Sequence, residues 1–144
     1  MANNAKAVIV LIVDDNQDSR ELLVKVLTMK GYETIEAVDG EDAINKATSE
    51  APDLILIDQS LPKISGYEVT KRLKQRATFR HVPIVALTAH AMRGEKEKAL
   101  QAGCDGYIAK PINIRTLPED IEAYLAHRQE AWPGDGTTEN SNRR

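Results

Sequence analysis

The chain has 144 residues, of which 42% are hydrophobic and 28% are charged, and its formal net charge at pH 7 is −3. This length suits one domain with a core of its own, and the mild negative charge gives no general attraction to nucleic acids or anionic membranes. A single cysteine, Cys104, excludes an internal disulfide and a cysteine-built zinc site. No apolar run approaches the ~20 residues of a membrane span, so we expect a soluble, cytoplasmic protein that binds neither nucleic acid nor membrane.

The first half of the chain alternates apolar segments with amphipathic ones. Residues 7–13 are all apolar and are predicted to form a buried strand. Residues 20–30 place apolar side chains on one helical face, and Gly31 is a typical helix stop. A weaker strand candidate, residues 32–38, precedes a helix over 39–50. The order so far is strand, helix, strand, helix.

The same alternation continues through the middle of the chain. Residues 54–57 and 83–87 are short apolar runs with many branched side chains, as expected of strands buried on both faces. Between them, a capping box of the Ser-x-x-Glu type opens a helix over 65–75. A further helix is predicted over 92–102, because its apolar residues recur at helical spacing.

The last strand and helix lie on either side of a proline-containing loop. Residues 107–109 are a short strand candidate. Thr116 is the best cap for the final helix, since it puts Pro118 in the first turn and Glu119 three residues on. Residues 129–144 are polar and contain little that could form a core, so we expect a disordered tail there.

Five strand-helix units in succession predict an α/β fold. Strands that alternate with helices form a parallel sheet covered on both faces, so we expect a five-stranded doubly wound sheet with five helices. The folded domain is predicted to span residues 7–128, behind a short N-terminal extension over residues 1–6.

Polar side chains follow the predicted strands at the edge where ligands bind in open α/β sheets. Asp14 and Asp15 end the first strand, Asp58 the third, Thr88 the fourth and Lys110 the fifth. Each has an ordinary explanation by itself, because an acid after a strand commonly caps the next helix and a lysine can pair with a carboxylate. All five together at one edge favour a functional site.

Three clustered carboxylates would repel one another without a cation. Hard oxygen ligands with room for water are typical of Mg²⁺ sites, so we expect Mg²⁺ as the cofactor. Aspartate carboxylates can act as nucleophiles that form aspartyl phosphates, and Lys110 and Thr88 could then hold the phosphoryl oxygens. The cluster therefore predicts phosphoryl transfer to Asp58.

Four segments resemble the receiver domain of two-component response regulators, the CheY-like family. They are the pair Asp14-Asp15 and the stretches LILIDQSLPKISGYE, LTA and YIAKP, and the resemblance covers about residues 7–127. It implies the flavodoxin-like strand order 2-1-3-4-5. It also implies a phosphoacceptor signalling protein of a phosphorelay, which assists its own phosphorylation and dephosphorylation but is not otherwise an enzyme.

The resemblance implies a role for each acidic residue. Asp58 would accept a phosphoryl group from a histidine kinase or a histidine phosphotransfer protein. Asp15 and Asp58 would bind Mg²⁺ directly and Asp14 through water, and the backbone carbonyl of Ser60 would be a further ligand. The side chain of Ser60 and that of His90 would tune how long the phosphoryl group survives.

The remaining implied roles concern phosphoryl binding and output. Thr88 and Lys110 would hold the phosphoryl group, and the Lys110–Pro111 bond would be cis. Thr88 and Tyr107 would form the switch that changes a protein-binding surface over the helix at 92–102, the last strand and the last helix. We expect a stand-alone receiver without an output domain, and nothing in the sequence identifies its downstream protein partner.

Three other functions fit the sequence less well. A phosphatase with an aspartyl-phosphate intermediate would have a second acid two residues after the nucleophile, where this chain has Ser60. A flavin carrier of similar fold would have a phosphate-binding loop after the first strand, where Asp14 and Asp15 would repel a phosphate. A scaffold that never carries phosphate would have lost one of the five groups.

Overall fold

The computed structural model describes residues 7–89 and 93–131, and within the second range the side chains of residues 94–126. The expected extension over residues 1–6, His90 and residues 132–144 of the expected tail lie outside the described residues. Within these ranges, no helix has both the length and the apolar character needed to cross a membrane.

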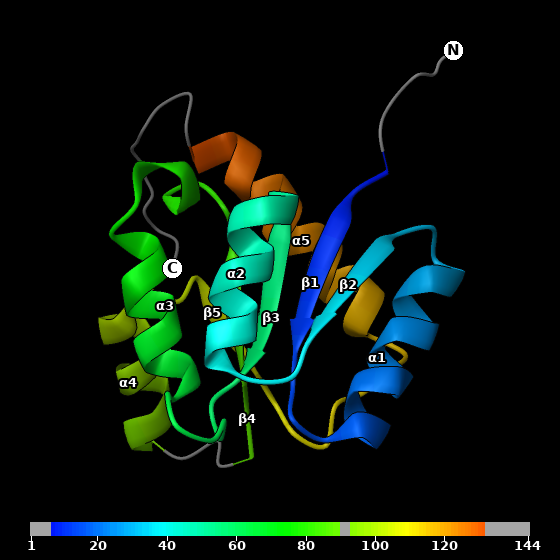
Figure 1. Ribbon diagram of the computed structural model, residues 1–144. Coiled ribbons are helices and arrows are strands. Elements are labelled where there is room, and N and C mark those ends of the chain that lie inside the picture. Colours follow the sequence, from blue (N-terminus) through cyan, green and yellow to red (C-terminus); the bar gives the residue numbers. More distant parts are fainter. Residues whose placement is uncertain (1–6, 90–92, 132–144) are drawn as a thin grey trace.

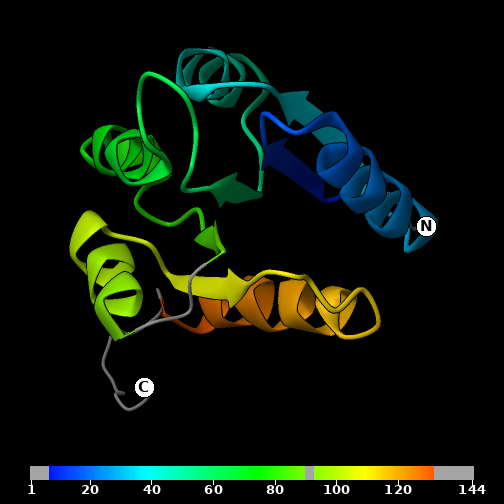
Figure 2. The same ribbon diagram turned by 90° about the horizontal axis from the view of Figure 1, so that it is seen from below.

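The strands form one parallel sheet in the order β2-β1-β3-β4-β5, which confirms the predicted topology. All neighbouring strands pair in parallel, and Figure 1 shows β1, β2 and β3 running downward, so the carboxyl ends share the lower edge of the sheet, which faces the viewer in Figure 2. The strands are β1 (Ile9–Val13), β2 (Glu33–Ala37), β3 (Leu54–Asp58), β4 (Ile84–Thr88) and β5 (Gly106–Ala109).

Helices cover both faces of the sheet. Figures 1 and 2 show α2, α3 and α4 on one side and α1 and α5 on the other. The helices are α1 (Gln17–Met29), α2 (Gly40–Glu50), α3 (Gly66–Lys74), α4 (Arg93–Ala102) and α5 (Leu117–Ala131), and a short 3-10 turn, η1 (Ala77–Phe79), follows α3.

The core follows the alternation of side chains along the strands. In β1, Leu11 and Val13 pack with residues of α2 and α3, whereas Val10 and Ile12 pack with residues of α1 and α5. β3 and β4 are buried along their whole length. The central strands are therefore fixed on both faces, and the groups at their carboxyl ends extend from a rigid base.

Side-chain caps set where three helices begin. Asn16, Asp39 and Ser65 each accept a hydrogen bond from the backbone three residues on, at the start of α1, α2 and α3. The Ser65 cap is the one predicted. The prediction that the first helix begins at Arg20 was wrong: it begins at Gln17, because the Asn16 cap satisfies a free backbone N–H one turn before the apolar stripe starts.

Lys74 ties several loops together at the edge of the sheet opposite to the strand carboxyl ends. Its Nζ donates to the carbonyls of Phe79 and Val82 at 3.2 and 2.8 Å and lies 3.1 Å from Asp105 Oδ2. The same Asp105 oxygen accepts the backbone N–H of Ile84. One ammonium group thus joins the end of α3, the segment before β4 and the turn between α4 and β5.

Candidate phosphoryl-transfer site

The turn between β1 and α1 presents the acid pair. The Asp14 side chain is fully buried, and its Oδ1 accepts the backbone N–H of Asn16 at 2.9 Å. The backbone N–H of Asp14 donates to the Ala37 carbonyl of β2, which extends the parallel ladder by one residue. Asp15, the next residue, is exposed. One carboxylate of the pair is therefore held inside the site, and the other faces solvent.

Asp58 ends β3 at the centre of the sheet. It is only 5% exposed, and its Oδ1 accepts the backbone N–H of Ser60 at 3.1 Å. The chain then turns into α3, where Gly66 donates its N–H to the carbonyl of Gln59. A Cβ atom at Gly66 would collide with the Asp58 carbonyl, so glycine is required for α3 to start this close to the site.

Lys110 joins the two buried carboxylates. Its Nζ lies 3.3 Å from Asp14 Oδ2 and 3.2 Å from Asp58 Oδ2. Burial raises the pKa of Asp14 above its ordinary value, and the lysine and the Asn16 N–H only partly oppose this. Burial by itself would lower the pKa of Lys110, but the charges of Asp58 and Asp14 outweigh it and raise that pKa. The ammonium therefore stays charged between its partners.

Thr88 and Tyr107, the two residues of the predicted switch, lie on the neighbouring strands β4 and β5. Thr88 is buried at the carboxyl end of β4, and its carbonyl accepts the backbone N–H of Lys110. Tyr107 is half-buried on β5 and packs with Ala86 and Cys104. Ala86 and Thr88 are two residues apart on β4, so they face the same side of the sheet. The peptide bond between Lys110 and Pro111 is cis.

The acid cluster has the chemistry of a Mg²⁺ site. One carboxylate oxygen from each of Asp14, Asp15 and Asp58 lies within 4.8 Å of the others. Such a set of hard oxygen donors, partly open to water, is typical of Mg²⁺ sites, whereas zinc and copper sites use softer ligands. The structure thus brings together all five groups that the sequence predicted at the strand edge.

Two side chains near the site were given no role by the sequence interpretation. Arg20 Nη1 donates to the Asp14 carbonyl at 2.9 Å. Gln59, which follows the predicted phosphoacceptor, is buried, and its Nε2 donates to the Ile57 carbonyl. For Arg20, the sequence offered one signal, which is an arginine one turn into the helix after the acid pair. For Gln59 the sequence offered no signal, because its burial depends on how α3 packs.

Comparison with known proteins agrees with this geometry. Residues 10–122 match the family described as the response regulator receiver domain. The polar-differentiation response regulator DivK of Brucella anthropi is 45% identical over 116 residues, which are 81% of this chain and 94% of that protein.

Two solved structures of response regulators have similar folds. A putative response regulator from Chloroflexus aurantiacus aligns with a TM-score of 0.81 and 36% identity, over 84% of this chain and 99% of that one. The chemotaxis response regulator CheY4 of Vibrio cholerae aligns with a TM-score of 0.79 and 29% identity, over 83% of this chain and 99% of that one. Fold, acid cluster and relatives agree, and the chain belongs to the receiver domain family of two-component response regulators.

Proposed function

We propose that Asp58 of this receiver domain accepts a phosphoryl group from a phosphohistidine on a histidine kinase or a histidine phosphotransfer protein. The proposal rests chiefly on one observation: the Lys110 ammonium lies within 3.3 Å of both Asp14 and Asp58, inside a cluster of three carboxylates at the strand edge. A buried carboxylate beside a fixed cation at that edge is a suitable acceptor for a phosphoryl group.

In the proposed reaction, an Asp58 carboxylate oxygen attacks phosphorus and forms a P–O bond. The P–N bond to the donor imidazole breaks, and its electron pair remains on the ring nitrogen, which takes up a proton. The product is an acyl phosphate on Asp58, and its hydrolysis would return the carboxylate and inorganic phosphate. In this proposal the domain assists its own phosphorylation, with the phosphohistidine as the donor, and its own dephosphorylation.

The other site residues have distinct proposed roles. Lys110 would hold one phosphoryl oxygen by charge, and the Thr88 hydroxyl would donate to another. Asp14, Asp15, Asp58 and the Ser60 carbonyl would hold Mg²⁺, which supplies positive charge next to the phosphoryl oxygens when it is bound. The Ser60 side chain, exposed beside Asp58, and His90 would tune the lifetime of the acyl phosphate.

We propose that the output is a change in protein binding. When the Thr88 hydroxyl moves toward the phosphoryl group, Tyr107 would turn inward beside β4, where it already packs against Ala86. The surface of α4, β5 and α5 would then differ between the two states, and a downstream protein would bind one of them more tightly. The free thiol of Cys104 is compatible with a reducing cytoplasm, where we place the protein.

Intact-mass spectrometry tests the phosphoacceptor. After incubation with acetyl phosphate and Mg²⁺, the protein should gain one phosphoryl group, and Asp58→Asn should gain none. Asp53→Asn is a matched control, because Asp53 lies just before β3 at its other end. Phosphorylation of Asp58→Asn at the wild-type level would contradict the assignment. Release of phosphate from many unrelated phosphomonoesters would favour a phosphatase instead.

The metal requirement is tested with the acid pair. Asp14→Ala/Asp15→Ala should lose Mg²⁺ binding in calorimetric titration and keep a cooperative thermal transition, because loss of clustered like charges relieves repulsion. An unchanged Mg²⁺ affinity in this double variant would argue against the proposed site.

A further inference from the structure

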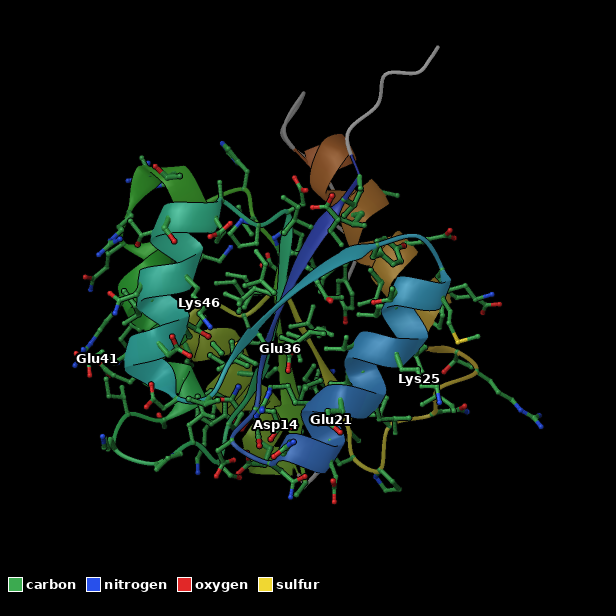
Figure 3. All side chains as sticks on the ribbon, turned by 45° about the vertical axis from the view of Figure 1, so that its right-hand side comes forward. Asp14, Glu21, Lys25, Glu36, Glu41 and Lys46 are labelled. Atoms are coloured by element: carbon green, nitrogen blue, oxygen red, sulfur yellow. The ribbon has the colours of Figure 1, made fainter. Side chains whose placement is uncertain are left out.

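Arg20 connects the acid pair to the edge strand of the sheet. It lies in the first turns of α1, and its guanidinium group reaches back over the β1–α1 turn. Nη1 donates to the Asp14 carbonyl and Nε to Glu36 Oε1 on β2, both at 2.9 Å, and the side chain is only 13% exposed. Figure 3 shows Asp14 and Glu36 near each other beside the start of α1.

The Asp14 carbonyl belongs to the peptide group that joins the two acidic residues. A peptide group is planar, so one plane contains the carbonyl and the Cα atoms of both Asp14 and Asp15. A donor that holds this carbonyl restrains the ψ torsion of Asp14 and the φ torsion of Asp15, and these torsions set the direction in which both side chains leave the main chain. The guanidinium fork suits this task, because its donors keep a fixed angle to one another.

The backbone of Glu36 is held in place, and from there its side chain, 45% exposed, reaches the guanidinium group. The Glu36 backbone carbonyl accepts Lys46 Nζ at 2.6 Å, and that ammonium lies 3.5 Å from Asp42 Oδ2 on α2. The Glu36 carboxylate also offsets the guanidinium charge at close range. The contribution of Arg20 to the acid cluster is therefore more geometric than electrostatic.

We propose that Arg20 is a positioning residue that holds the Asp14–Asp15 peptide plane, so that both carboxylates point toward the ion and the phosphoryl group. This inference rests on the proposed function, because it assumes that the acid pair binds Mg²⁺. Arg20 itself contacts the Asp14 main chain and Glu36 and would touch neither the ion nor the phosphoryl group.

The test compares Mg²⁺ affinity, measured by calorimetry, in Arg20→Gln, Arg20→Lys and wild type. Loss of an outer partner of a metal ligand typically weakens metal binding about 10-fold or more, so Arg20→Gln should do so. Arg20→Lys keeps the charge but carries its donors on one nitrogen, so it cannot reproduce the planar two-point geometry of the guanidinium, and we expect a dissociation constant about 3-fold weaker than wild type. Thermal melting without Mg²⁺ reports any general loss of stability separately.

Arg72→Gln is the matched control. Arg72 pairs through Nε with Glu68 at 3.1 Å within α3, so its replacement removes the same charge and the same kind of ion pair. Its Mg²⁺ affinity should stay within about 2-fold of wild type, because a surface pair on one helix contributes little.

The outcomes separate this inference from the proposed function. A folded Arg20→Gln variant whose Mg²⁺ affinity and rate of phosphorylation by acetyl phosphate equal those of wild type overturns the positioning role and leaves the proposed function standing. If Arg20→Gln does not fold, Arg20→Lys decides in the same way: weaker Mg²⁺ binding supports the role, and unchanged binding overturns it. A wild-type protein that binds no Mg²⁺ would overturn both.

Discussion

Asp14 is a buried carboxylate whose ionised form costs the folded protein free energy. Its pKa is raised above 3.8 by burial, despite the nearby Lys110. The folded state therefore holds the Asp14 proton more tightly than the unfolded state does. The resulting penalty is fully present at neutral pH, and it disappears as the pH falls through the folded pKa toward 3.8.

Asp14→Asn should accordingly raise the melting temperature by a few degrees at pH 7. The asparagine Oδ1 can still accept the Asn16 N–H, so the gain reflects the lost charge. The gain should shrink as the pH is lowered toward 4. Asp15→Asn removes a charge from an exposed position and should change the melting temperature less. A melting temperature of Asp14→Asn below that of wild type at pH 7 would contradict this prediction.

The thiol of Cys104 is expected to be unreactive in the folded protein. It is 5% exposed, its Sγ lies 3.8 Å from the Thr70 hydroxyl oxygen, and burial raises its pKa from 9.0 to about 11. The thiolate fraction at pH 8 is then about 100-fold lower than for a free cysteine. Iodoacetamide should alkylate the native protein at least that much more slowly than the urea-unfolded protein. Comparable rates would mean that Cys104 is accessible.

At the level of single residues, the sequence was sufficient to predict the five groups that end strands, but it was insufficient to predict the residues that support them. Asp58 and Lys110 lie together because parallel strands end at one edge, which the order of elements already implies. Arg20 contacts Asp14 only because its side chain turns back toward β1 and meets Glu36 from β2. That arrangement depends on side-chain conformation and strand pairing, which no local pattern encodes.

Among the elements, α4 is joined to its neighbour α3 at its first turn through the side chain of Tyr67. The Tyr67 hydroxyl of α3 donates to Glu95 Oε1 at 2.6 Å and lies 3.3 Å from the Glu95 carbonyl. Burial and the Glu95 carboxylate raise the pKa of Tyr67 well above its ordinary value, so the hydroxyl remains a donor. This bond restrains the end of α4 that is nearest to the proposed phosphoryl site.

Tyr67→Phe should free that end of the helix. We expect a loss of about 1 kcal/mol in the free energy of unfolding, as for a typical hydrogen bond, measured by urea denaturation. Amide hydrogen exchange should rise in the first turn of α4 more than in its last turn. Tyr32→Phe, on the opposite face of the sheet, is the control and should leave exchange in α4 unchanged. Equal protection of α4 in Tyr67→Phe and wild type would refute the restraint.

Element type was predictable, and element ends were less so. Buried strands such as β3 and β4 stand out because continuous apolar runs occur where a strand is covered on both faces. The start of α1 was misplaced because the apolar stripe begins one turn after the Asn16 cap. Capping is a local signal but a weak one, since Asp15 and Asn16 are both suitable caps and only the backbone conformation decides between them.

For the whole molecule, the described part of the chain packs around one sheet, and α5 reaches Ala131. Residues 132–144 are mostly polar and contain little that could form a core. A protein that ends at Ala131 should therefore be phosphorylated by acetyl phosphate at the full-length rate, because the five proposed site groups all lie before it. A protein that ends at Arg128 removes the last residues of α5 and serves as a comparison. A large rate change on removal of residues 132–144 would show that they act on the domain.

The contacts of Lys74 give α4 two unequal ends. After α4, Cys104 is buried and Asp105 is joined to the Lys74 ammonium and to the Ile84 N–H, so this end is anchored to β4 and α3. The first turn is restrained by the Tyr67 hydroxyl. A rotation of α4 would therefore pivot about its carboxyl end, and displacement would grow toward the first turn. A partner that distinguishes the two states would gain the most discrimination by binding over the amino-terminal half of this helix.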